Sequence, residues 1–153
     1  MKEVVGQEQK KKIIDMEPEI EAMTMKNIAD YKANGIKDLK TTDTGLKYVI
    51  HSEGNGALPI KGENVKVYYY GATVADAKKF DSSFGRGAAF TVPLGTGGVI
   101  AGWEEALLLL KKGTKATVFI PGKLAYGEAG VPNMIAPNAE LAFYIDCLLY
   151  TSP

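Results

Sequence analysis

The sequence predicts an α+β fold with a mainly antiparallel sheet of five strands and one internal helix. From residue 41 onward the chain consists of short β-type runs separated by glycine-rich segments. Only one segment between these runs has a helical pattern, and most connections are of hairpin length. Antiparallel pairing is favoured because parallel strands would need a long crossover after nearly every strand.

The first 40 residues differ in composition from the rest, and we interpret them as a helical leader preceding a domain over residues 41–153. They contain 16 of the 36 charged side chains but only two of the 17 glycines and one of the 14 aromatic residues. We expect one helix over residues 2–16 and a second that begins at Pro18, because proline is tolerated in the first turn of a helix. Asn34-Gly35 predicts where the second helix ends.

Five runs have the alternating or aromatic-rich pattern of strands, and a helix is predicted between the third and fourth. The strand candidates are residues 45–50, 65–70, 89–92, 115–120 and 140–148. Residues 102–113 are the helix candidate because acids lie early, lysines lie late and a glycine closes the segment.

Composition excludes several classes of function. With 18 Lys and Arg against 18 Asp and Glu, the formal net charge is zero, which argues against nucleic-acid partners and anionic lipid. No apolar run approaches the roughly 18 residues needed to span a bilayer, so no membrane span is predicted. One cysteine and one histidine cannot supply a zinc site or a Cys-His catalytic pair, and we predict neither a metal nor a cofactor.

The compartment follows less directly from the sequence. The first residues have no apolar core of the kind that a signal peptide needs. We therefore predict a cytoplasmic protein, with a periplasmic or exported location as the alternative if Met1 was added at a processing site.

Local motifs do not predict a reactive centre. Residues 95–98 superficially resemble a phosphate loop but lack the Walker lysine pattern. Glu104 and Glu105 open the predicted helix, where acids are favourable without a catalytic role. His51 is interpreted as a surface residue and Cys147 as a small buried hydrophobe.

An ordered set of aromatic and polar residues is more informative than any single motif. On periodicity alone these aromatic residues would be assigned to the core. Their order in the chain points further, through Phe80-Asp81-Ser82-Ser83, then residues 99–103 (VIAGW), then Ala125-Tyr126-Gly127. Over residues 45–149 this ordered set resembles the FKBP family of peptidyl-prolyl cis/trans isomerases. The leader also resembles the helical segment that precedes the isomerase domain in bacterial relatives.

The resemblance implies a five-stranded antiparallel sheet curled around one short helix, with the site between the concave face and that helix. Trp103 would form the floor of the pocket. The residues implied as walls are Tyr69, Phe80, Phe90, Val99, Ile100 and Phe143, with Ile135 on a late loop.

The resemblance also implies where the polar groups act. Asp81 would accept hydrogen bonds at the pocket edge and pair with Arg86. The Tyr126 hydroxyl and the Ile100 N–H would hold substrate carbonyl groups. We accordingly assign catalytic roles to Tyr69, Asp81, Tyr126 and Phe143, and substrate binding to the other residues of this set.

Three positions on the late loop depart from the family pattern. Val131 stands where many members have histidine, Met134 where a β-branched residue is frequent, and Ala136 where the first of two prolines is usual. We expect these departures to affect substrate preference and the affinity for macrolide inhibitors such as tacrolimus and rapamycin.

The sequence therefore predicts an isomerase of X-Pro bonds in unfolded or flexible polypeptides, assisting folding without a cofactor. Two alternatives stay open. The chain could be a non-catalytic peptide-binding module or holdase chaperone, or its leader could serve mainly as the arm of a homodimer that presents two pockets.

Overall fold

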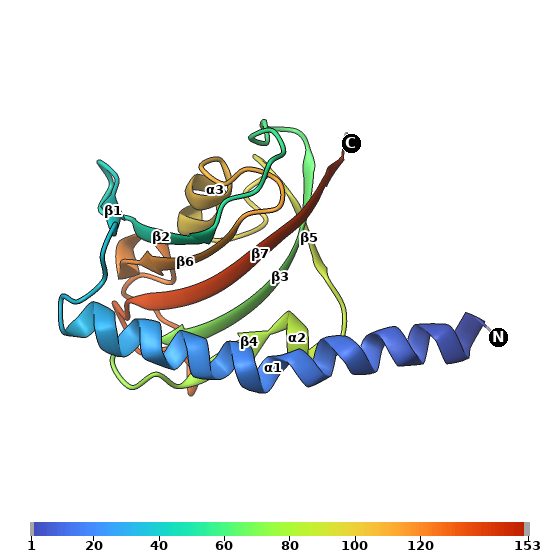
Figure 1. Cartoon of the computed structure of the whole chain (residues 1–153). Coiled ribbons are helices and arrows are strands. Elements are labelled where there is room, and N and C mark those ends of the chain that lie inside the picture. Colours follow the sequence, from blue (N-terminus) through green and yellow to red (C-terminus); the bar gives the residue numbers. More distant parts are fainter. Residues whose placement is uncertain (1, 152–153) are drawn as a thin grey trace.

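The computed structural model describes residues 2–151, in which the strands form one antiparallel sheet (Figure 1). The order of its strands is β1-β2-β6-β7-β3-β4, and β5 also pairs with β3. The strands are β1 (Lys40–Thr41), β2 (Lys47–Ser52), β3 (Asn64–Thr73), β4 (Lys79–Ser82), β5 (Phe90–Pro93), β6 (Lys115–Ile120) and β7 (Leu141–Thr151).

All five predicted strands are present, and two short ones are added. The predicted number of five is corrected to seven, because β1 has only two residues and β4 only four, too few to give a strand pattern in the sequence. The antiparallel pairing is confirmed for every strand pair.

The helical segments are α1 (Lys2–Lys32), α2 (Ser83–Arg86), α3 (Ala101–Leu107) and the 3₁₀ turn η1 (Gly122–Leu124). The prediction of a single internal helix over residues 102–113 was too long at its C-terminal end. The chain leaves the helix after Leu107, and Leu110 is then buried in the core. The predicted last turn is therefore absent, and the chain after Leu107 instead takes a path that buries the Leu110 side chain.

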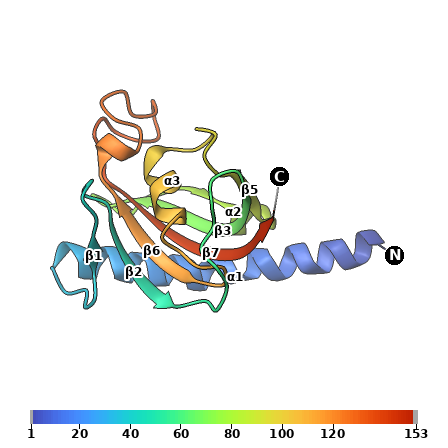
Figure 2. The same cartoon turned by 90° about the horizontal axis from the view of Figure 1, so that it is seen from above.

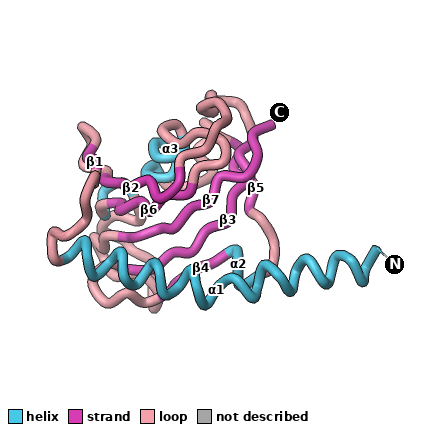
Figure 3. The backbone as a smooth tube through the Cα atoms, viewed as in Figure 1, coloured by secondary structure: helices cyan, strands magenta, loops and turns pink. Residues whose placement is uncertain are grey.

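Alternation along the strands divides the core into two layers, one on each face of the sheet. In β3, Tyr69 belongs to the layer under α3, whereas its neighbour Tyr70 belongs to the layer under α1. In β7, Phe143 and Tyr144 are divided in the same way. Figures 1 and 3 show α3 and α1 on opposite sides of the sheet, so we call these the concave face and the convex face.

The leader forms one continuous helix, so the predicted break before Pro18 is wrong. A proline inside a helix removes one hydrogen bond to the carbonyl four residues earlier. Pro18 lies on the exposed side of α1, where water can solvate that carbonyl. On the opposite side Ile20 is buried against the sheet, and this packing favours a continuous helix across the proline.

The second half of α1 covers the convex face. Ile20, Thr24 and Ile28 are buried there, and Tyr31 stacks on Phe119 with ring centroids 4.0 Å apart. Thr24 explains why the apolar stripe looked imperfect in the sequence: its hydroxyl donates to the Ile20 carbonyl at 2.8 Å and so tolerates burial.

The predicted stop at Asn34-Gly35 is confirmed, with Asn34 in the left-handed conformation at φ 57°. The Gly35 N–H donates to the Asp30 carbonyl and the Asn34 N–H to the Tyr31 carbonyl, which together form a Schellman motif. At the other end, the N-terminal part of α1 extends beyond the sheet, as Figures 1 and 2 both show. None of the helices described combines the length and the apolar character that crossing a membrane requires.

Candidate active site

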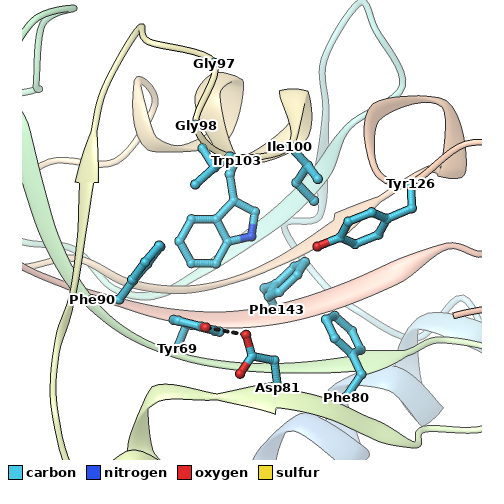
Figure 4. A pocket seen from close by; sticks show the side chains of 11 residues that line it. Tyr69, Phe80, Asp81, Phe90, Gly97, Gly98, Ile100, Trp103, Tyr126 and Phe143 are labelled. Carbon is cyan, nitrogen blue, oxygen red and sulfur yellow. Dashed lines mark hydrogen bonds between the residues drawn. The ribbon is translucent and has the colours of Figure 1, made fainter. Parts of the chain in front are cut away.

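A pocket of about 450 Å³ opens between the concave face of the sheet and α3 (Figure 4). Its lining comes from four strands, the start of α3 and two loops. The lining residues are Tyr69, Phe80, Asp81, Phe90, Gly97, Gly98, Val99, Ile100, Trp103, Tyr126 and Phe143.

The interior of the pocket is aromatic, and its rings meet edge to face. Trp103 projects from α3 into the centre of the pocket, and its ring lies 4.9 Å from that of Tyr69 and 5.2 Å from that of Phe143, both at 89°. Phe80 contacts Phe143 at 5.4 Å and 90°. Mutual edge-to-face contacts of this kind stabilise the rings in fixed positions, so the apolar surface keeps its shape without a ligand.

A network of charged and polar groups lies at one edge of these rings. The Asp81 carboxylate accepts the Tyr69 hydroxyl at 2.5 Å and an Arg86 N–H at 2.6 Å. A second Arg86 N–H donates to the Tyr69 oxygen at 2.9 Å, which closes a three-membered cycle. Because the guanidinium also lies over the Tyr69 ring, 5.6 Å from its centroid, the network fixes Asp81 on the pocket edge.

This environment keeps the Tyr69 hydroxyl protonated. Burial and the hydrogen bond to Asp81 raise the pKa of Tyr69 to about 12, although the positive charge of Arg86 opposes the shift. Burial, followed by the charge of Asp81, also raises the pKa of Tyr126. Both phenols are therefore hydrogen-bond donors at neutral pH and not bases.

The two donors that the resemblance assigns to substrate carbonyl groups have no acceptor among the described residues. The Tyr126 hydroxyl points into the pocket (Figure 4) and makes no hydrogen bond there. The N–H of Ile100, the residue that precedes α3, is likewise without a protein acceptor among residues 2–151. Unpaired donors beside an apolar cavity are positioned to receive the carbonyl groups of a bound ligand.

Nine of the eleven residues assigned from the sequence line this pocket, and the other two lie elsewhere. Arg86 stands behind the edge and acts through Asp81 and Tyr69. Ile135 does not line the pocket: it is buried and faces a separate hollow of about 540 Å³ between residues 73–78 and 129–139. Val131, Met134 and Ala136 line that same hollow, so the three departures from the family pattern lie outside the aromatic pocket.

Gly97 and Gly98 line the pocket and were not among the residues assigned from the sequence. The structure also explains the weak phosphate-loop pattern at residues 95–98. The Gly95 and Gly97 N–H groups donate to the Glu104 carboxylate at 2.7 and 3.2 Å, so these donors are already occupied. The place of the loop directly before Val99 and Ile100 was the available signal for its role as a wall.

The other polar residues weighed in the sequence have structural partners. Glu105 accepts hydrogen bonds from Thr42 and Thr44, both at 2.6 Å. His51 is exposed, with its Nε2 2.7 Å from the Thr117 hydroxyl. Among residues 2–151 no three His, Cys, Asp or Glu side chains are grouped so that they could hold a metal ion.

Comparison with known proteins bears directly on this pocket. Residues 56–148 match the family model described as FKBP-type peptidyl-prolyl cis-trans isomerase, which is more than half of the chain. The chain belongs to this family. Every residue that lines the aromatic pocket lies inside the matched segment.

Individual FKBP-type relatives extend the match into the leader. A probable isomerase named FkpA from Neisseria meningitidis is 40% identical over 149 residues, which cover 96% of this chain and 54% of the relative. FkpA from Escherichia coli is 41% identical over 84% of this chain and 49% of the relative. The chain thus spans about half the length of the curated FkpA proteins it matches.

A shorter relative and two solved structures complete the comparison. FK506-binding protein 1 from Candida glabrata is 41% identical, and the match covers 71% of this chain and 96% of that protein. The crystal structure of FkpA from Escherichia coli aligns with a TM-score of 0.72 at 38% identity, over 90% of this chain and 63% of that one. The crystal structure of AtFKBP13 aligns at 0.70 and 31% identity, over 74% of this chain and 98% of that chain. The FKBP fold expected from the sequence is confirmed.

Proposed function

We propose that the chain accelerates cis/trans rotation of X-Pro peptide bonds in flexible or unfolded polypeptides. The observation that carries this proposal is the form of the pocket: its interior is aromatic, and the charged side chain of its lining, Asp81, lies at one edge. Membership of the FKBP family and the names of its isomerase relatives support it.

The reaction needs no nucleophile, because rotation about an amide breaks no covalent bond. Its barrier of roughly 18–20 kcal/mol comes from the partial double bond of the planar amide. The planar form is the more polar one, and water stabilises it. An apolar pocket that strips water from the amide therefore favours the twisted transition state, which is catalysis by differential binding. A millionfold acceleration needs about 8 kcal/mol of such preference.

The residues divide this task between shape and polarity. The ring of a substrate proline would lie over Trp103, between Phe143 and the edge of Tyr69. The free donors of Tyr126 and Ile100 would hold carbonyl groups on either side of the rotating bond. Asp81 would then face the rotating bond as the one negatively charged group of the lining.

The first test is a protease-coupled assay of cis/trans isomerisation with a short proline peptide, run with and without rapamycin. We expect an acceleration that rapamycin suppresses. Asp81→Val should lower kcat/KM by about tenfold or more, because the rim loses its charge and Tyr69 loses its acceptor. If folded protein gives no acceleration, the proposal is contradicted and the binding-module or holdase alternative is favoured. That alternative would be supported if the protein still suppresses aggregation when its pocket is blocked.

A homodimer through the leader is the second proposal, and a specific feature favours it. The N-terminal part of α1 extends beyond the sheet. In the first half of the same helix, Ile14 and Met16 are exposed apolar side chains. Molar mass by light scattering tests this with a version of the chain that begins at Glu17, which keeps the half of α1 that covers the sheet. A dimer that becomes a monomer supports the proposal, and an unchanged molar mass contradicts it. The cytoplasmic location stays a prediction from the sequence.

A further inference from the structure

The short helix α2 lies between α1 and the active-site pocket. Two glycines on α2 and after it allow a very close approach to α1. A Cβ atom added to Gly85 would lie 2.8 Å from Glu17 Oε2, and one added to Gly87 would lie 2.3 Å from Lys10 Cγ. These short distances place the backbone of Gly85 against the Glu17 side chain and that of Gly87 against Lys10, so α2 and its C-cap pack directly on α1.

Glu17 is the residue of α1 that binds this segment most specifically. Its two carboxylate oxygens accept hydrogen bonds from the Ser82 hydroxyl at 2.8 Å and from Lys79 Nζ at 2.7 Å. The Glu17 side chain is only 19% exposed. Although burial raises the pKa of Glu17, the hydrogen bonds from Lys79 and Ser82 outweigh it and lower that pKa below the usual 4.5.

The contact of Glu17 with Ser82 also determines how α2 begins. Ser82 is the N-cap of α2, and its oxygen accepts the Gly85 N–H at 3.2 Å. A hydroxyl has one hydrogen and two lone pairs. When that hydrogen is donated to Glu17, the lone pairs are left facing Gly85, so Glu17 orients the cap.

The other side of the same segment carries the polar edge of the pocket. Asp81 directly precedes Ser82 and accepts the Ser82 N–H at 2.8 Å. Arg86, the last residue of α2, reaches both Asp81 and the Tyr69 hydroxyl. The position of α2 therefore sets the point from which the Arg86 side chain reaches Asp81 and Tyr69.

We propose that Glu17 is a positioning residue for the active site, because it fixes α2 and thereby holds Arg86 against Asp81 and Tyr69. The inference rests on the proposed isomerase function, and it gives the leader a role in catalysis within one chain. Glu17 touches no substrate. Its effect passes through the cap at Ser82 to a charge pair that borders the pocket.

The test compares Glu17→Ala with a matched control on the same helix. Asp15→Ala removes another carboxylate that pairs with a lysine, but the Asp15–Lys11 pair is exposed and joins two residues of α1 itself. Two quantities are measured on the full chain: kcat/KM with a proline peptide, and the position of the Arg86 side-chain N–H signal in a ¹H–¹⁵N spectrum, assigned with Arg86→Lys. Urea unfolding of each variant records stability separately.

We expect Glu17→Ala to lower kcat/KM by about fivefold and to shift the Arg86 signal, because small displacements at an active site have large effects on rate. Glu17→Gln should keep most of the activity, since its amide oxygen can still accept the Ser82 hydroxyl. Asp15→Ala should leave both quantities unchanged. If Glu17→Ala does not fold, Ser82→Ala breaks the same link and should give the same two changes.

Two results would overturn the inference. In one, Glu17→Ala lowers stability but moves neither kcat/KM nor the Arg86 signal, which would leave Glu17 a purely structural role. In the other, Asp15→Ala has the same effect as Glu17→Ala. A wild-type protein without isomerase activity would refute the proposed function instead, and the Arg86 signal would still report whether Glu17 positions the guanidinium.

Discussion

The two faces of the sheet are both lined with aromatic rings, but in the described part of the chain the aromatic pocket opens on the concave face, whereas α1 covers the convex face. Neighbouring residues of the same strands supply both linings: Tyr69 and Phe143 face α3, whereas Tyr70 and Tyr144 face α1. On the convex face, α1 fills the available space with Ile20, Ile28 and Tyr31. On the concave face, α3 has seven residues and covers only part of the surface, so a cavity remains.

The polar groups of the two faces differ in whether their hydrogen-bond donors have acceptors within the protein. Against α1, the Tyr31 hydroxyl donates to Glu140 and the Tyr70 hydroxyl to Glu21, which leaves both phenols satisfied. In the pocket, the Tyr126 hydroxyl and the Ile100 N–H have no acceptor among the described residues. Aromatic content therefore does not identify the site. The helix that covers each face distinguishes them, because the long α1 covers the convex face whereas the short α3 leaves part of the concave face open.

The strongest way to break the contrast is to detach α1 from the convex face. Ile28 is 2% exposed there, and Ile28→Asp would bury an unpaired charge. We expect a loss of about 4 kcal/mol in the free energy of unfolding. Met25→Asp is the matched control, because Met25 is 45% exposed on the same helix. Urea unfolding measures both, and equal losses would show that the convex face is not sealed by α1.

One substitution on each face separates fold from function. Phe143→Leu should lower kcat/KM by about tenfold, because the pocket loses a ring that contacts both Trp103 and Phe80. Phe119→Leu makes the same exchange under Tyr31 and should cost about 1 kcal/mol of stability. Its kcat/KM should stay within about twofold of the wild type. The measurements are peptide isomerisation and urea unfolding of both variants. If both substitutions lowered the rate of isomerisation equally, the two faces would not differ in function.

The hydrogen bonds that seal the convex face have a smaller effect. Tyr31→Phe removes the hydroxyl that donates to Glu140 at 2.5 Å. We expect a loss of about 1 kcal/mol in stability, with the rate of isomerisation unchanged. Tyr48→Phe serves as control, because the Tyr48 hydroxyl has no hydrogen-bond partner among the described residues. Thermal unfolding of both proteins is the measurement. If the stability of Tyr31→Phe equals that of the wild type, this hydrogen bond does not stabilise the packing of α1 on the convex face.

The smallest expected effect is a pH dependence of stability at the same seam. His51 faces Asn27 of α1, Thr117 of β6 and the ring of Tyr144. Although His51 is an exposed residue, these neighbours partly desolvate its ring and lower its pKa below the usual 6.5, so the folded state favours the neutral ring. Because the unfolded chain then binds more protons, stability should fall as the pH drops through about 6.5. The slope measured between about pH 7.5 and 5.5 should be weaker in His51→Gln, and an equal slope would exclude His51 as its origin.

The sequence predicted the concave face better than the convex face, for a physical reason. The pocket is lined by residues from short distinctive motifs, such as Phe80-Asp81 and Ala125-Tyr126-Gly127, whose order in the chain is recognisable. The convex face only has to fill space. There Glu17 and Thr24 occupy the inner side of α1 and interrupt its apolar pattern, and Pro18 suggested a break that packing on the sheet overrides.

Long-range placement explains most of the other differences. Ile135 was assigned to the pocket from the resemblance but lies outside it, whereas Gly97 and Gly98 were not assigned and line it. Loop paths are hard to predict because they depend on tertiary contacts such as those of Glu104 with Gly95 and Gly97. The position of α2 against α1 was equally invisible. It depends on contacts between residues more than 60 positions apart in the chain, such as Glu17 and Ser82.

The central position of β7 has a consequence for how the protein folds during its synthesis. This last strand lies between β3 and β6 and is hydrogen-bonded to both along most of its length. Until Leu141–Thr151 leaves the ribosome, the two halves of the sheet have no common partner and Phe143 is missing from the pocket. Folding of the sheet must therefore wait until β7 has been synthesised, and the long loop closures involved make it slow for a domain of this size. A catalyst proposed to hasten the folding of other chains would itself depend on slow pairing between distant strands.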